Sequence, residues 1–219
     1  MSLFARLPRL AAAFLCLALA TAFAYAQAPG KDFKPINPPQ PTPPGKVEVI
    51  EFFSYACPHC HSLAGPLSEW LKRKPADVEF KRVPAVFNDT WLQYARIYYT
   101  LEALGLVDKL HHDVFAAIHK QKMRLNDPKV FEDWAASKGV DRKKVADTYN
   151  SFAVKSLTQR AVELTKRYGI DFTPSMVVDG RYITGPSMTS TGNEVDYGRF
   201  FKVVEQMVAN ARRPGAGKK

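Results

Sequence analysis

The sequence has 219 residues, of which 46% are hydrophobic and 24% are charged. These values are typical of a globular domain and exclude general disorder, and three cysteines are too few for a small protein held together by a disulfide framework. The formal net charge is +10, but the basic residues are dispersed and no nucleic-acid-binding motif accompanies them, so we expect no nucleic-acid partner.

Residues 1–26 have the three-part pattern of a secretory signal peptide. A short segment with Arg6 and Arg9 precedes an apolar run over residues 10–23, and residues 24–26 read Ala-Tyr-Ala, the small-residue pattern of a cleavage site. The alternative is a retained membrane anchor, although the apolar run is short for a membrane span. The pattern therefore predicts export.

The next part of the sequence indicates alternating strands and helices. Segment 27–45 contains seven prolines, which excludes a helix or a central strand, so we expect an extended lead-in on the surface. The apolar run over residues 46–55 predicts a strand buried on both faces. Helical spacing of apolar residues predicts a helix over 57–74 and several more helices within 88–168, with a second strand over 78–83.

Strands return near the C-terminus. Residues 175–184 consist of two short apolar runs separated by Asp179 and Gly180, a pair that suits the tight turn of a β-hairpin. Thr191 and Glu194 then have the spacing of a capping box, which predicts the start of a final amphipathic helix.

This order of elements defines an α/β layer architecture that is interrupted by an all-helical insertion. We expect one α/β domain in two parts, one on each side of the insertion. The expected segments are the signal peptide (1–26), the proline-rich extended segment (27–45), the first part of the α/β domain (46–87), the helical insertion (88–160), the second part (161–212) and a flexible basic tail (213–219).

The motif Cys57-Pro58-His59-Cys60 follows the predicted buried strand and begins the predicted helix. A disulfide across so short a loop constrains the unfolded chain little, so we expect the pair to be kept for its reactivity. The free N–H groups and the dipole at a helix N-terminus stabilise a thiolate, chiefly at Cys57, and favour the reduced protein. We expect Pro58 and His59 to tune this effect, and Cys60 to be the less exposed, resolving thiol.

The same motif admits three other interpretations. Together with His61 it fits the c-type haem attachment pattern, although a preceding strand is unusual for such segments. A zinc site would need further ligands, and His111, His112 and His119 have no paired spacing. The third alternative is a passive structural disulfide. We expect neither a cofactor nor a metal ion.

A second candidate motif is the pair Thr173-Pro174, ahead of the predicted hairpin. Proline cannot donate to a strand ladder, so Pro174 either simply begins the strand or forms a cis X–Pro bond. A cis-proline loop beside the dithiol would leave backbone groups of Thr173 free to pair with an extended substrate.

These features together resemble the DsbA family of thiol:disulfide oxidoreductases in the thioredoxin superfamily. The resemblance covers nearly the whole mature chain and implies a thioredoxin fold interrupted by an all-helical insertion domain. It also implies a periplasmic protein that donates its Cys57–Cys60 disulfide, through a mixed disulfide at Cys57, to folding secreted proteins with free thiols. A DsbB-like, quinone-linked membrane oxidase would then re-oxidise it.

The resemblance further implies a role for Glu51, six residues before Cys57. Burial in an apolar strand would raise the pKa of this carboxyl group, and the family suggests that it relays the proton of Cys60 during exchange. Alternatively, Glu51 lies at an edge of the sheet in contact with water. Arg82 best matches the position of a basic partner on the second strand, with Lys81 as the alternative.

The chain departs from the family pattern at Thr173, where the best-known members have valine. We expect the hydroxyl group to form a hydrogen bond near the sulfurs and to make the disulfide less oxidising. A disulfide isomerase or reductase of the same superfamily is the alternative enzyme. Such proteins are usually dimers with a dedicated dimerisation region, and none is visible in the sequence, so we expect a monomer.

Overall fold

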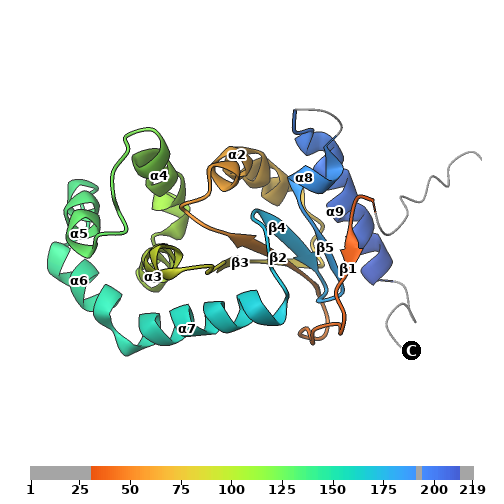
Figure 1. Ribbon diagram of the computed structural model, residues 1–219, viewed down its shortest axis with the longest axis horizontal. Coiled ribbons are helices and arrows are strands. Elements are labelled where there is room, and N and C mark those ends of the chain that lie inside the picture. The colour runs from red at the N-terminus through yellow and green to blue at the C-terminus, as the bar shows by residue number, and fades with distance from the viewer. Residues whose placement is uncertain (1–30, 191–193, 213–219) are drawn as a thin grey trace, which may run out of the picture.

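The computed structural model describes residues 31–190 and 194–212, which form a central mixed sheet with helices on both sides (Figure 1). The expected signal peptide, the expected tail at 213–219 and Thr191 lie outside the described residues. The strands are β1 (Lys34–Pro35), β2 (Val47–Phe53), β3 (Val78–Pro84), β4 (Ser175–Val178) and β5 (Tyr182–Thr184), in the order β1-β5-β4-β2-β3. Only the β2–β3 pair among them is parallel.

The helices surround this sheet in two layers. They are α2 (Pro58–Arg73), α3 (Asp89–Ala103), α4 (Val107–His119), α5 (Pro128–Ser137), α6 (Arg142–Asn150), α7 (Phe152–Arg167), α8 (Pro186–Thr189) and α9 (Tyr197–Ala211). In Figure 1, α2 and α9 lie on one side of the sheet and α7 runs along the other. No helix within residues 31–190 and 194–212 is long and apolar enough to cross a bilayer.

Strand β2 is buried along its whole length, which confirms the predicted doubly covered strand. Successive side chains of a strand point to opposite faces. Accordingly, Val47 and Val49 pack in the cluster that contains Trp70 of α2, whereas Ile50 and Phe52 belong to the cluster that contains the side chains of α3 and α7. The central strand thus joins two hydrophobic cores.

Helices α3 to α7 follow one another without an intervening strand, as the helical block predicted. Both α3 and α7 contact β3, so this block packs directly on the sheet. Helix α7 is continuous from Phe152 to Arg167. An insertion boundary at residue 160 would therefore cut one helix, and α7 belongs to both parts of the molecule.

The β4–β5 hairpin confirms the turn predicted at Asp179 and Gly180. Both residues have positive φ, 52° and 62°, as a primed two-residue turn requires. Gly180 is required for a second reason, because a Cβ atom there would collide with the backbone carbonyl of Gln40. The Gln40 backbone N–H donates to the Gly180 carbonyl at 2.9 Å.

The structure corrects two sequence-based expectations. The proline-rich segment does not simply lie on the surface: β1 pairs with β5 at the sheet edge, and Phe33 is completely buried. A two-residue edge strand tolerates Pro35 because half of its backbone groups need no partner. The capping box at Thr191 and Glu194 also does not begin the last helix, because Asp196 caps α9 by accepting from the Arg199 backbone N–H at 2.9 Å.

We predict that Phe33→Ala lowers the free energy of unfolding by about 3–5 kcal/mol, because it leaves a cavity in the core. The Phe33 ring packs edge-on against Tyr182, with ring centroids 5.5 Å apart. Denaturant unfolding of the purified protein measures this change. Phe152→Ala is the matched control, since Phe152 is 84% exposed and should change stability by less than about 0.5 kcal/mol. Equal effects of the two substitutions would contradict the prediction.

Candidate active site

The dithiol lies where β2 ends and α2 begins. A tight turn connects the two elements, with the Cys57 backbone N–H donating to the Ser54 carbonyl at 3.0 Å. Cys57 is the N-cap residue of α2, Pro58 follows in the first turn, and the Cys60 backbone N–H donates to the Cys57 Sγ at 3.3 Å. A sulfur atom thus occupies the position where a side-chain oxygen usually caps a helix.

The two cysteines differ in accessibility. Both carry free thiols in the structure. Cys57 is 6% exposed and Cys60 is completely buried, whereas Pro58 and His59 are exposed beside them. The geometry therefore matches the predicted division into an attacking sulfur at Cys57 and a shielded sulfur at Cys60.

The environment separates the pKa values of the two thiols. The pKa of Cys57 falls from 9.0 to about 6, mainly because the Cys60 side chain hydrogen-bonds to its sulfur. Burial opposes this change, while the Thr173 side chain and the backbone N–H groups of Cys60 and His59 reinforce it. The pKa of Cys60 is raised well above its usual range, first by burial and then by the neighbouring Cys57. At neutral pH Cys57 is thus the thiolate and Cys60 the thiol.

The loop before β4 lies beside Cys57. The Thr173–Pro174 peptide bond is cis, as the second interpretation of this motif predicted. The Thr173 carbonyl lies 3.5 Å from the Cys57 Sγ and accepts from its thiol form. Pro174 is buried, and Ser175 then begins β4 opposite Phe52 of β2. Sheet pairing therefore brings two motifs together that are more than a hundred residues apart in sequence.

The effect of the Thr173 side chain on the pKa of Cys57 argues against the expected effect of its hydroxyl group on the redox equilibrium. We expected it to make the disulfide less oxidising, but hydrogen bonding from the Thr173 side chain lowers the pKa of Cys57. A donor to the sulfur stabilises the thiolate, which belongs to the reduced protein, and therefore makes the disulfide more oxidising.

Glu51 is buried on β2 and paired with a cation on β3. It is 2% exposed, which excludes the solvated alternative, and the Arg82 Nε donates to its Oε2 at 3.0 Å. Burial raises the pKa of the Glu51 carboxyl group, Arg82 lowers it, and the charge of Cys57 raises it further. Glu51 and Arg82 are direct neighbours in the β2–β3 register, so the expected choice of Arg82 is confirmed.

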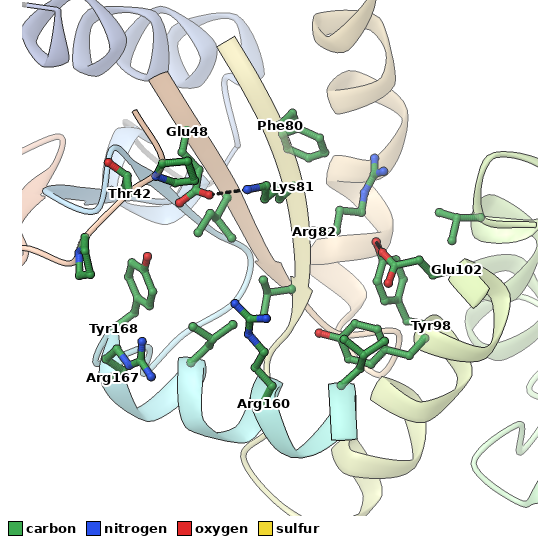
Figure 2. A pocket seen from close by; sticks show the side chains of 18 of the residues that line it. Thr42, Glu48, Phe80, Lys81, Arg82, Tyr98, Glu102, Arg160, Arg167 and Tyr168 are labelled. Carbon is green, nitrogen blue, oxygen red and sulfur yellow. Dashed lines mark hydrogen bonds and ion pairs between the residues drawn. The ribbon is translucent and has the colours of Figure 1, made fainter. Parts of the chain in front are cut away.

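Lys81 has different partners. Its ammonium group pairs with Glu48 at 2.8 Å and with Glu79 at 3.1 Å. Figure 2 shows Lys81 turned toward Glu48, while Arg82 extends from the other side of β3. Because consecutive strand residues point in opposite directions, Lys81 and Arg82 serve different carboxylates.

Two histidines that were not among the predicted site residues contact the turn before the dithiol. The Nε2 of His119 lies 2.8 Å from the Tyr55 carbonyl, and the Nδ1 of His111 lies 2.9 Å from the Tyr55 hydroxyl. We had considered these residues only as scattered zinc ligands. In the part of the chain that the structure describes, no three acidic, histidine or cysteine side chains are grouped to hold a metal. His111 and His119 are eight residues apart, with Phe115 midway between them, which places all three on one face of a helix. This spacing was the one feature of the sequence that could have indicated that the two histidines act together.

A reactive Cys-x-x-Cys pair at the N-terminus of α2, beside a cis-proline loop, defines the thiol:disulfide oxidoreductases of the thioredoxin fold. Residues 77–193 match the family described as the DSBA-like thioredoxin domain. Two relatives are named thiol:disulfide interchange protein DsbA. The one from Bordetella parapertussis is 46% identical over 90% of this chain and 93% of its own length. The one from Burkholderia cepacia is 44% identical over 81% and 84%.

Solved structures agree with these sequence relatives. The crystal structure of Pseudomonas aeruginosa DsbA is 35% identical, with a TM-score of 0.79 over 84% of this chain and 94% of that one. The oxidoreductase NmDsbA1 from N. meningitidis is 28% identical, with a TM-score of 0.73 over 84% and 94%. The chain belongs to the DsbA family and is a thiol:disulfide oxidoreductase with a thioredoxin fold and a helical insertion. The haem-carrier and isomerase alternatives are not favoured.

We predict that the stability of the reduced protein rises with pH between about 6 and 9. Cys57 has a pKa of about 6 when folded, against 9.0 ordinarily, so within this window the unfolded state binds more protons. The contribution is lost as the pH falls through 6. Above about 9 the raised pKa of Cys60 opposes it. Denaturant unfolding at several pH values tests this. The Cys57→Ser substitution should remove this rise. If the free energy of unfolding changed with pH in the same way in the unmodified protein and in Cys57→Ser, the prediction would be refuted.

We predict that Thr173→Val raises the pKa of Cys57 and makes the disulfide less oxidising, because valine keeps the shape of the side chain but removes its hydroxyl group. The equilibrium constant for reduction of the protein disulfide by glutathione should fall by about twofold to tenfold, which corresponds to the free energy of one hydrogen bond. Thr184→Val is the control. It removes a buried hydroxyl group that donates to the Asp32 carbonyl at 2.6 Å, so stability should fall while the pKa of Cys57 stays unchanged. A more oxidising Thr173→Val protein would contradict this prediction.

Proposed function

We propose that the chain is an exported oxidase that donates the Cys57–Cys60 disulfide to folding secreted proteins with free thiols. The observation that supports this direction best is the lowered pKa of Cys57, about 6. A stabilised thiolate favours the reduced protein over the disulfide, and reduction of that disulfide oxidises the substrate.

The reaction proceeds in two exchanges at Cys57. A substrate thiolate attacks the Sγ of Cys57, the Cys57–Cys60 bond breaks, and Cys60 leaves as a thiolate that takes up a proton. A second substrate thiolate then attacks the substrate sulfur of the mixed disulfide and releases the Cys57 thiolate. The substrate loses two electrons and two protons and gains a disulfide, and the protein becomes a dithiol. The low pKa of Cys57 makes it the better leaving group in the second exchange.

The neighbours of Cys57 are proposed to tune potency and to bind substrate. Pro58 and His59 are exposed next to the sulfur, and the His59 backbone N–H lowers the pKa of Cys57. The carbonyl of Thr173 lies 3.5 Å from the Cys57 Sγ. A substrate chain attached to this sulfur would lie along Thr173 and Pro174 and pair with their loop as an added strand.

Glu51 is proposed to exchange a proton with Cys60. Both groups are buried, and the charge of Glu51 is one of the causes that raise the pKa of Cys60. Arg82, the partner of Glu51, lines a cavity of about 930 Å³ on the face covered by α3 and α7 and a second one of about 180 Å³ between α2 and α4. Because both cavities reach Arg82, we propose that the proton is exchanged with solvent on this side of the ion pair.

The working cycle is proposed to need two kinds of protein partner and no cofactor bound to this chain. Secreted proteins with free thiols accept the disulfide, and a DsbB-like, quinone-linked membrane oxidase takes up the electrons. We place this cycle in the periplasm because the N-terminal sequence has the pattern of an export signal and an oxidising compartment preserves the disulfide. We propose that the chain acts as a monomer, since the sequence has no recognisable dimerisation region.

The test is the redox equilibrium of the mature protein with glutathione. We expect the equilibrium to favour the reduced protein strongly, and denaturant unfolding to show that the reduced form is more stable than the oxidised form. In parallel, Cys60→Ser should accumulate a mixed disulfide with a thiol peptide, whereas Cys57→Ser should not. An oxidised form that is the more stable one would instead identify a reductase and overturn the proposal.

A further inference from the structure

Helix α4 of the insertion contacts the turn that carries the dithiol at two points on one residue. His119 hydrogen-bonds to the backbone carbonyl of Tyr55 at 2.8 Å, and His111 to its hydroxyl group at 2.9 Å. Tyr55 is 1% exposed and lies two residues before Cys57. A single side of α4 therefore fixes both the backbone and the side chain of Tyr55.

The direction of the first hydrogen bond follows from its chemistry. A carbonyl oxygen can only accept, so the Nε2 of His119 carries the hydrogen and donates it. The second hydrogen bond joins a neutral pair. Burial and the nearby Arg82 hold the pKa of His111 well below its usual range, and burial raises that of the Tyr55 hydroxyl.

The same histidine also contacts the residue that follows the dithiol. The rings of His61 and His119 are stacked, with centroids 5.2 Å apart and planes 16° apart, and His61 also stacks on Phe115 at 5.6 Å. His61 directly follows Cys60. His119 thus contacts the chain on both sides of the Cys57–Cys60 motif, through a hydrogen bond on one side and a ring contact on the other.

Tyr55 is a central residue of the turn from Ser54 to Cys57, which the Cys57 backbone N–H closes on the Ser54 carbonyl at 3.0 Å. The Ala56 backbone N–H is fixed as well, by the Ser54 Oγ at 3.1 Å. The Tyr55 carbonyl is the other end of the peptide group whose N–H, that of Ala56, donates to the Ser54 Oγ. Without the His119 donor, this carbonyl would lose its hydrogen bond in a buried turn two residues before Cys57, and the turn that holds the Cys57 sulfur against its donors would lose a restraint.

We propose that His119, supported by His111, is a positioning residue for the dithiol: it pairs the Tyr55 carbonyl and so helps to stabilise the Cys57 thiolate. His119 lies in the helical insertion, and it acts on the Cys57 sulfur through the turn that contains Tyr55. This inference rests on the proposed function of Cys57, and it adds a group outside the thioredoxin-like part of the chain to those that set the redox equilibrium.

The test compares two substitutions at position 119. His119→Phe keeps a ring that can stack on His61 and Phe115 but removes the donor, whereas His119→Gln restores a donor without the ring. We expect His119→Phe to raise the pKa of Cys57, measured by thiolate absorbance, and to lower the equilibrium constant with glutathione by about threefold to tenfold, as the loss of one hydrogen bond would. His119→Gln should recover most of this loss.

The matched control is His112→Phe, on the same helix. His112 is exposed and hydrogen-bonds to the Ser68 Oγ at 3.0 Å, not to Tyr55, so the pKa and the equilibrium should stay as in the unmodified protein. Tyr55→Phe provides an independent variant, since it removes only the hydrogen bond to His111 and should lower the constant by a smaller factor. This second variant keeps the test decisive if His119→Phe does not fold.

Two results would overturn the inference while leaving the proposed function in place. The first is an unmodified protein with a low Cys57 pKa that His119→Phe changes no more than His112→Phe does. The second is an equal loss in His119→Phe and His119→Gln, which would make the ring packing, not the donor, responsible. An ordinary Cys57 pKa in the unmodified protein would instead overturn the proposed function itself.

Discussion

The cap of α2 is the interaction on which the site depends. In most helices a serine or aspartate oxygen accepts the first free backbone N–H groups, but here the Cys57 sulfur accepts from Cys60 at 3.3 Å. The remaining hydrogen bonds to this sulfur come from the Cys60 side chain, which has the largest effect on its pKa, from the Thr173 side chain and from the His59 backbone N–H. Burial alone would make the thiolate unfavourable, so the lowered pKa exists only because these donors outweigh desolvation. The same arrangement begins a stable helix and creates a nucleophile.

The sheet supplies the geometry that this cap requires. Strand β2 ends one turn before Cys57, and its antiparallel neighbour β4 begins directly after the Thr173-Pro174 loop. The pairing of Phe52 with Ser175 places the Thr173 carbonyl beside the sulfur. A slip of one residue in this register would reverse the side chains of β4 and move the loop along the strand. The two buried cores on either side of β2 therefore also protect the geometry of the site.

Local signals in the sequence were sufficient for most of the fold and for the dithiol. The Cys57–Cys60 motif carries its own context, because a buried strand precedes it and helical periodicity follows, and the Asp179-Gly180 turn has a backbone requirement that few residue pairs satisfy. Arg82 was preferred to Lys81 because it best matched the position of a basic partner on the second strand, and the register that pairs Glu51 with Arg82 agrees with this choice.

Features that depend on tertiary contacts were not accessible in this way. Phe33 lies among prolines, and nothing near it in the sequence indicates that β1 closes a sheet edge over it. The roles of His111 and His119 depend on where α4 packs relative to the turn at Tyr55, which helical periodicity does not define. At Thr173 the residue type was informative, but the sign of its effect required knowing that the side chain donates to the sulfur.

The unequal exposure of the two sulfurs has a consequence for how the molecule meets other proteins. Cys60 is completely buried and Cys57 is 6% exposed, so only one atom is open to covalent attachment. The first incoming thiolate is therefore directed to the Sγ of Cys57, and a second thiolate attacks the sulfur that has become attached there. Because attack on one sulfur releases the other as a thiolate, the protein carries one covalently attached partner at a time, and the burial of Cys60 decides that this partner is attached at Cys57.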